Sequence, residues 1–250
     1  HLLYNTQRGM QVAIAIQRLQ TWLCSDVQVV GLSATIGSSA DVWRFFRPGY
    51  EVEDVIDKNG RGIDAQLRLN VSITELAGLL GKVDDTKVLV FANSRRDCDR
   101  IADQLERSDL KCSVFTHHSS LPREVREATE NGFEAAGAAI CVATSTLELG
   151  IDIGSIDLVV LFGIPADWQS LAQRVGRGNR RSTKIEALLC ASSEHAQPDS
   201  ISQLFGFQAL ILQITDPEIT DARPREIFGA AGQQLASWLV ANERFRGINP

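Results

Sequence analysis

Short, mostly apolar runs alternate with helical patterns along the middle of this 250-residue chain. Five such runs have the length of a strand: residues 87–91, 111–115, 139–143, 156–162 and 185–190. A nearly continuous apolar run is typical of a strand that is buried on both faces of a sheet. Helices between such strands act as crossovers. The alternation therefore predicts an α/β fold with right-handed crossovers and a parallel sheet covered on both faces.

The segments between these runs carry apolar residues at helical spacing. Cys98, Ile101, Ala102 and Leu105 lie at positions i, i+3, i+4 and i+7, which places them on one face of a predicted helix. Pro122 lies early in the next predicted helix, where its missing N–H costs nothing. Further helices are predicted over residues 9–23, 39–46, 76–80, 199–214 and 230–240 and from Asp167 onward, and a strand over residues 27–32.

The composition, with 44% hydrophobic and 22% charged residues, is that of a globular protein. No apolar run approaches the length of a membrane span, and no secretory signal precedes the predicted fold. The net charge of −6 does not indicate a nucleic-acid-binding protein, although local arginine placement decides such binding more than net charge does.

The five cysteines include no CxxC pair, and most of them lie in apolar runs. We therefore expect buried, reduced thiols, with zinc ligation as the alternative, and a cytoplasmic protein.

Polar residues follow the predicted strand 139–143 where it ends. Thr144 and Ser145 come first, and Gly150 and Asp152 follow after a short turn. In open α/β sheets, ligands bind at the carboxyl ends of the strands. Hydroxyls and a carboxylate at this place favour a ligand site.

Four arginines follow the helix that is predicted to begin near Asp167. They are Arg174, Arg177, Arg180 and Arg181. Guanidinium groups suit phosphate oxygens in charge and in geometry. Together with the polar residues after strand 139–143, they indicate a phosphorylated ligand.

The two stretches, residues 142–152 and 173–180, resemble motifs V and VI of superfamily-two helicases, most closely those of the large helicase-related (Lhr) group. Three more stretches resemble that family in the same order. Residues 33–35 are similar to motif III, residues 90–95 to motif IV, and residues 117–121 to the family's HHGSL segment. The resemblance covers about residues 1–190 and implies a RecA-like parallel sheet with helices on both faces, followed by a short, mainly helical C-terminal segment.

The family pattern implies a division of the chain into domains. Residues 1–50 correspond to the C-terminal remainder of the first RecA-like, ATP-binding domain, residues 51–70 to a linker, and residues 71–195 to the second, helicase C-terminal domain. Residues 196–250 form a helical segment where the family's winged-helix region begins.

The phosphate-binding half of the motor is largely missing from this sequence. In the family, a DExH tetrad precedes a segment like Thr6–Gly9, so His1 corresponds to its last residue and the Asp and Glu lie outside the chain. No GxxxxGK(S/T) loop occurs in these 250 residues. We therefore expect this chain alone to be inactive as an ATPase.

The resemblance implies that the parent protein is an ATP-dependent helicase or translocase. It would move 3′ to 5′ along its loading strand, with single-stranded DNA or an RNA–DNA hybrid as its partner, and would use ATP and Mg²⁺ whose ligands lie mostly outside this chain. The alternative is a nucleic-acid-binding or scaffold module that does not hydrolyse ATP. A Rossmann-like metabolic enzyme is disfavoured, because its GxGxxG fingerprint is missing.

The resemblance also assigns nucleotide-site residues. Arg177 and Arg180 match the arginine fingers, which stabilise charge on the γ-phosphate. Gly150, Asp152, Gln173 and Arg174 match nucleotide-binding positions. Solvated surface arginines and a turn-capping Asp152 are the simpler alternatives. Asn179 stands where the family has Gly, and Asn tolerates the left-handed backbone of such a turn. Glu148 is either a surface residue or an internal partner of a motif VI arginine.

Other positions match the nucleic-acid track and the coupling motif. Ser94, Arg95 and Thr144 match residues that hold the sugar-phosphate backbone, which carries no sequence information; turn capping is the alternative. The motif III residues Ser33, Ala34 and Thr35 match those that couple the nucleotide state to domain movement. His117 and His118 are expected to contact the backbone or to build the strand end, because they lack the further ligands that a metal site needs.

Overall fold

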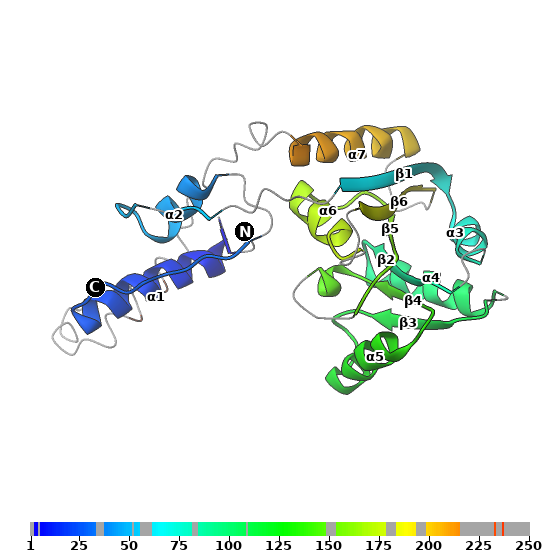
Figure 1. The fold of residues 1–250 in the computed structure, drawn as a ribbon, viewed down its shortest axis with the longest axis horizontal. Helices are drawn as coiled ribbons and strands as arrows, with labels where there is room; N and C mark the ends of the chain where they lie inside the picture. Colours follow the sequence, from blue (N-terminus) through cyan, green and yellow to red (C-terminus); the bar gives the residue numbers. More distant parts are fainter. Residues whose placement is uncertain are drawn as a thin grey trace. The chain divides into compact units, whose positions relative to one another are not determined.

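The structure, a computed structural model, describes residues 3–4, 6–33, 38–51, 53–55, 62–81, 85–108, 110–148, 154–178, 184–193, 199–215, 233 and 237. The chain forms two compact units. One comprises residues 1–57 with 217–250, and the other residues 58–216 (Figure 1). The predicted helix over residues 230–240 lies almost entirely outside the described residues.

The larger unit is built on a six-stranded sheet with the order β1-β6-β5-β2-β4-β3. Every pair of neighbouring strands is parallel, which confirms the predicted architecture. The strands are β1 (Gly62–Val71), β2 (Lys87–Ala92), β3 (Ser113–His117), β4 (Ala139–Ala143), β5 (Leu158–Phe162) and β6 (Lys184–Ser192). The helices are α3 (Ile73–Leu80), α4 (Arg95–Glu106), α5 (Arg123–Ala135), α6 (Trp168–Val175) and α7 (Ser200–Thr215), with a short 3₁₀ turn, η1, at Ser145–Leu147.

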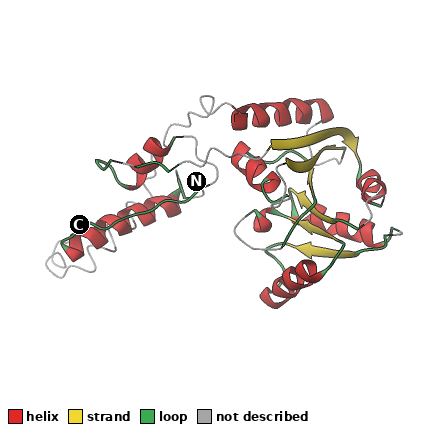
Figure 2. Cartoon of the chain, in the orientation of Figure 1, coloured by secondary structure: helices red, strands yellow, loops and turns green. Residues whose placement is uncertain are grey.

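The central strands bury side chains on both faces, as their apolar runs predict. In β2, Val88 and Val90 belong to one core cluster, whereas Leu89 and Phe91 belong to the other. The first cluster is completed by α3 and α4, including the four apolar residues predicted to share one helix face. The second is completed by α5, α6 and α7 through Phe133, Leu171, Val175 and Phe207. Helices therefore cover both faces of the sheet (Figure 2).

The structure corrects the predicted linker over residues 51–70. Gly62–Val71 forms the edge strand β1, paired in parallel with β6. Its apolar residues alternate with polar ones, as they do in a strand with unequal faces, and Ile63 and Leu69 are each 47% exposed. The alternation was a usable signal, but edge exposure made this segment look like a connection.

Helix α7 also belongs to the larger unit, although residues 196–250 were predicted to be a separate segment. Phe207 is fully buried in the second core cluster. Gln203 donates from Nε2 to the Ser192 carbonyl at 2.7 Å and accepts from the Ser192 N–H at 2.9 Å. This side chain takes the place of a neighbouring strand at the end of β6 and fastens α7 to the sheet.

The smaller unit contains α1 (Gln7–Leu23) and α2 (Ser39–Phe46), both as predicted. Tyr4, which precedes α1, packs edge-to-face against Phe45 of α2, with ring centroids 5.5 Å apart. The predicted strand over residues 27–32 is wrong, because these residues have no strand structure and Leu32 is 91% exposed. A strand requires a pairing partner, and the described part of this unit supplies only helices and loops.

The cysteine prediction is confirmed for three of the five thiols. Cys98, Cys141 and Cys190 are buried, whereas Cys112 is half-buried and Cys24 is exposed. Burial raises the pKa of Cys98 and of Cys190 to about 12 in each case. These two thiols are therefore neutral at physiological pH. In the described part of the chain, no helix combines the length and the apolar character that crossing a membrane requires.

Candidate nucleotide and nucleic-acid interface

Most of the predicted site residues that the structure describes lie at the carboxyl edge, which we define as the edge where the parallel strands end. Ser94 and Arg95 follow β2, His117 ends β3, and Thr144 follows β4. The backbone N–H of Thr144 donates to the His117 carbonyl at 3.2 Å, which holds the ends of β3 and β4 together. A parallel sheet places these loops side by side, as expected for a ligand site.

Arg174 is the buried centre of a polar network at this edge, whose other members are the buried side chain of Glu148 and exposed Asn93. Its Nε donates to Glu148 Oε1 at 2.6 Å, and its Nη1 donates to Asn93 Oδ1 at 2.9 Å. The guanidinium also lies 5.4 Å from the centroid of the Phe91 ring. The Arg174 and Glu148 side chains are only 6% and 9% exposed. Glu148 is therefore an internal partner of a motif VI arginine, which resolves the alternative that the sequence left open.

Arg177 is also buried, at 8% exposure, and its Nη2 donates to the backbone carbonyl of Glu148 at 2.7 Å. The side chain is thus not a solvated surface arginine. It holds the segment that follows η1, which is the motif V segment. Arg174 and Arg177, at the end of α6 and just after it, therefore bind the same residue. Arg174 binds the side chain of Glu148, and Arg177 binds its backbone carbonyl.

Local sequence features put these arginines in place. Asp167 caps α6 by accepting from the Ser170 N–H at 2.7 Å, so the helix begins where the sequence predicted. Gly178 follows Arg177 at a close approach to the sheet, because an added Cβ would lie 2.8 Å from Ile185 Cγ2. Only glycine allows the chain to pass the sheet at this distance.

Arg95 is held by two hydroxyl groups from the loop after β3. Its Nη1 donates to Ser120 Oγ at 2.5 Å and its Nη2 to Ser119 Oγ at 2.8 Å. All three residues are exposed. The loops after β2 and β3 therefore present one guanidinium and two hydroxyls to solvent, a combination that suits a phosphate oxygen.

Ser94 has a structural role in addition to any contact with a ligand. Its hydroxyl accepts from the Asp97 N–H at 3.0 Å and donates to Asp97 Oδ2 at 2.8 Å, so it caps α4. The capping alternative therefore applies to Ser94. Thr144 is different, because it is 8% exposed and its hydroxyl makes no capping hydrogen bond to η1.

The paired histidines build the strand end. His117 is fully buried, with Nδ1 2.8 Å from Thr146 Oγ1 and Nε2 2.8 Å from Glu130 Oε1. His118 Nε2 lies 3.0 Å from Asp99 Oδ1. Among the described residues, no cluster of three or more His, Cys, Asp or Glu side chains is suited to a metal ion.

Several predicted site residues lie outside the described residues. These are Ala34, Thr35, Gly150, Asp152 and Arg180. Of the predicted coupling residues only Ser33 is described, and it lies in a loop of the smaller unit. Gln173 lies in α6, one residue before Arg174, and is half-buried.

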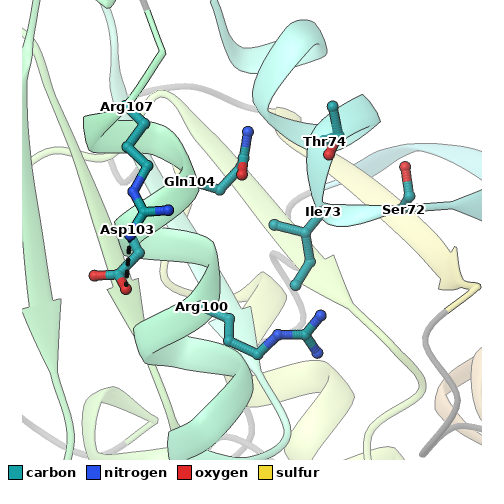
Figure 3. A pocket seen from close by; sticks show the side chains of 7 residues that line it. All are labelled: Ser72, Ile73, Thr74, Arg100, Asp103, Gln104 and Arg107. Atoms are coloured by element: carbon teal, nitrogen blue, oxygen red, sulfur yellow. Dashed lines mark ion pairs between the residues drawn. The ribbon is translucent and has the colours of Figure 1, made fainter.

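A pocket elsewhere on the larger unit lies between α3 and α4 (Figure 3). The residues that line it are Ser72, Ile73, Thr74, Arg100, Asp103, Gln104 and Arg107. Asp103 and Arg107 form an ion pair at 4.0 Å across one helical turn. The described residues around this pocket include none of the predicted site residues, so it plays no part in the interface.

Similarity to a family model and to known proteins identifies the family of this chain. Residues 71–182 match the family model of the helicase conserved C-terminal domain. The chain is 32% identical over 207 residues to the ATP-dependent helicase Lhr-Core protein 2 of Thermococcus barophilus, covering 74% of this chain and 24% of that protein. The chain belongs to the Lhr-like group of superfamily-two helicases.

Two solved structures share the fold of this Lhr-like chain. One is helicase Lhr of Mycobacterium smegmatis bound to ssDNA and AMP-PNP, with a TM-score of 0.77 and 24% identity, covering 97% of this chain and 33% of that chain. The other is the DUF1998 helicase MrfA bound to DNA, with a TM-score of 0.68 and 23% identity, covering 82% of this chain and 30% of that one. The predicted RecA-like fold is confirmed.

The Lhr-like chain spans about a quarter of the length of the curated relatives it matches. Sequence reasoning did not identify Asn93 as a site residue and left Glu148 undecided. The position of Asn93 directly after β2, within the stretch 90–95 that resembles motif IV, was the available signal. Its partners come from α6 and from the loop after β5, and no sequence spacing reports such contacts.

Proposed function

We propose that the protein to which this chain belongs is an ATP-dependent helicase or translocase that moves along single-stranded DNA. In this proposal the chain supplies the second RecA-like domain, which is the larger unit and includes β1 and α7 beside the predicted residues 71–195. The observation that carries it is the buried network in which Arg174 and Arg177 hold Glu148 at the carboxyl edge. Such a network links the motif V and motif VI segments, which face the nucleotide in this family.

The nucleotide side of the proposal rests on the arginines of α6 and the turn after it. Arg177 and Arg180 are the proposed fingers, with Gly150, Asp152 and Gln173 at the nucleotide. Arg177 would exchange its bond to the Glu148 carbonyl for one to a γ-phosphate oxygen, where charge develops in phosphoryl transfer. Arg174 is already held by a carboxylate and an amide, which supports a role in shaping the motif V segment.

The nucleic-acid side of the proposal rests on the loops after β2, β3 and β4. Arg95, Ser94 and Thr144 would contact the phosphate backbone of a single strand. Exposed Arg95 and its hydroxyl partners Ser119 and Ser120 support this role. Contacts of this kind position a strand without reading its bases, as a translocating motor requires.

Magnesium belongs to the proposal as the companion of ATP, whose phosphate charge it would neutralise when bound. The described residues contain no cluster that fits such an ion, so its ligands are assigned to other parts of the protein. Movement in the 3′ to 5′ direction, action on RNA–DNA hybrids and a cytoplasmic location are further parts of the proposal, since the family resemblance and the composition imply them.

The smaller unit is proposed to be part of the first RecA-like domain, through residues 1–50. Few of its described residues are buried, and Trp22 is 80% exposed. Val30 and Leu32, in the stretch 27–32 that has the composition of a strand, are also exposed. In this proposal, residues of the same domain outside this chain cover these groups, and Ser33 to Thr35 couple the nucleotide to movement.

The test uses the full-length protein, with ATP turnover measured with and without single-stranded DNA and unwinding measured on duplexes with a 3′ or a 5′ tail. We expect DNA-stimulated turnover and unwinding from the 3′ tail. Glu148→Gln should lower turnover, whereas Glu124→Gln on exposed α5 should not. DNA binding without ATP hydrolysis by the wild-type protein would establish the scaffold alternative.

A further inference from the structure

Asn93 joins two parts of the carboxyl edge that the backbone does not connect directly. Its Oδ1 accepts from Arg174 Nη1 at 2.9 Å, and its Nδ2 donates to the Ile164 carbonyl at 2.7 Å. The partners fix this orientation of the amide, because a guanidinium only donates and a carbonyl only accepts. The side chain therefore uses its acceptor and its donor at once, toward different elements.

The Arg174 end of this bridge leads to the motif V segment. Arg174 donates to Glu148 at 2.6 Å, and both side chains are almost fully buried. A change in the position of Glu148 or Arg174 would therefore alter the hydrogen bond that Asn93 accepts from Arg174. In the proposed function, these are the residues next to the nucleotide.

The Ile164 end of the bridge leads to α7. An added Cβ on Gly206 would lie 2.1 Å from Ile164 Cδ1, so α7 and the loop after β5 approach each other closely at this glycine. Helix α7 is fastened in turn to β6 by Gln203. The contacts thus run from Glu148 through Arg174, Asn93 and Ile164 to α7.

We propose that Asn93 is a positioning residue that ties Arg174 to Ile164 and α7, and that this bridge couples ATP turnover to strand movement. The proposal rests on the proposed function and names the residue through which Arg174 of motif VI, bonded to Glu148 of motif V, acts on Ile164 and α7. Asn93 itself touches neither nucleotide nor nucleic acid in this role.

The competing explanation is that Asn93 only shapes the turn after β2. Asn and Asp serve turns in the same way, through a side-chain oxygen. Asp also accepts a hydrogen bond from Arg174, but it has no N–H to offer to the Ile164 carbonyl. Asn93→Asp therefore removes one arm of the bridge and retains the turn residue, which separates the two explanations.

The experiment measures ATP turnover, the KM for ATP and base pairs unwound per ATP in the full-length protein. We expect Asn93→Asp to leave the KM nearly unchanged and to lower unwinding per ATP about fivefold, a factor within the range of one net hydrogen bond. Asn131→Asp, which makes the same charge change on exposed α5, is the matched control. Wild-type unwinding per ATP in Asn93→Asp would overturn the proposal.

A second readout does not depend on activity. Hydrogen exchange without ATP should be about fivefold faster over residues 163–175 and 200–215 in Asn93→Asp than in the wild type. If the wild type hydrolyses no ATP, the proposed function fails, and unchanged exchange would overturn the bridge separately. Asn93→Ser, too short to reach both partners, should give the same losses if Asn93→Asp does not fold, and wild-type behaviour of Asn93→Ser would equally overturn the proposal.

Discussion

Three arginines at the carboxyl edge are held by different kinds of partner. Arg174 is buried against a carboxylate and an amide, Arg177 is buried against a backbone carbonyl, and Arg95 is exposed between two hydroxyls. A neutral carbonyl binds a guanidinium less strongly than a carboxylate does. The bond from Arg177 to the Glu148 carbonyl is therefore weaker than the bond from Arg174 to the Glu148 carboxylate.

Replacing Arg177 by Ala in the full-length protein should lower ATP turnover by about 10³–10⁵-fold, the contribution of an arginine finger. Affinity for single strands should remain nearly unchanged, because the proposed strand contacts lie at Arg95 and Thr144. Turnover and strand binding are measured on the same preparation, together with Arg180→Ala. A variant that retains turnover and loses DNA binding would place Arg177 on the nucleic-acid side.

Arg95→Ala and Thr144→Ala should weaken single-strand binding for all base sequences alike. Arg95→Ala should also reduce the slope of log K against log salt concentration by about 0.7, the value for one phosphate contact on a single strand. Titrations at several salt concentrations measure both effects. Arg107→Ala, a loss of the same charge at the other end of α4, is the control. An effect confined to particular base sequences would contradict a backbone role.

Among the elements, α4 depends on the residue that also belongs to the proposed strand contact. Ser94→Ala should lower the free energy of unfolding by about 1 kcal/mol, because the α4 cap is lost. Ser94→Asp retains a capping oxygen, but its carboxylate would lie against that of Asp97, so it should recover only part of the stability, and its negative charge should weaken DNA binding. Urea denaturation and strand titration of both variants separate these roles. Unchanged DNA affinity in Ser94→Asp would leave Ser94 as a cap alone.

Helix α7 depends on Gln203 for its attachment. Gln203→Leu leaves a buried N–H and a buried carbonyl of Ser192 without their partner, at about 1–3 kcal/mol for each group. We expect a clear fall in the urea midpoint of the chain. Gln208→Leu, on the exposed side of the same helix, should have little effect. Equal midpoints for the two variants would show that α7 is held by its apolar contacts alone.

At the scale of the whole molecule, the 250-residue chain by itself should show no appreciable nucleic-acid-stimulated ATPase activity. Its sequence contains no GxxxxGK(S/T) loop. Arginine fingers cannot act unless such a loop binds the phosphates of ATP. Turnover is measured on the purified chain with and without single-stranded DNA. Robust activity that copurifies with the chain through several steps would contradict this expectation.

The sequence predicted the strands that are buried on both faces, because such strands appear in it as apolar runs. The strands at residues 87–92 and 139–143 are of this kind, and they were predicted to within one residue. The segment of β1 was predicted to be a linker strand and not a member of the sheet, because exposed strands carry a weaker pattern. The hydrogen bonds between the Gln203 side chain and the Ser192 backbone correspond to no sequence pattern.

The candidate site shows the same division. Motif spacing predicted Arg174 and Arg177 as site residues, and the structure buries both at the carboxyl edge. It did not predict that they share Glu148 or that Asn93 completes the network. Those facts depend on distances between loops, which the sequence does not record, and the proposed roles of all these residues stay predictions.

The pairing of β1 with β6 has a consequence for synthesis in the cell. Gly62 is opposite Lys184, so about 120 residues separate the partners along the chain. A ribosome that adds about 5–20 residues per second needs roughly 6–24 s to pass from one to the other. During that interval β1 has no β6 to pair with. Strand β1 is therefore the last strand of the sheet to find its partner. It is available to a chaperone for the whole of this interval.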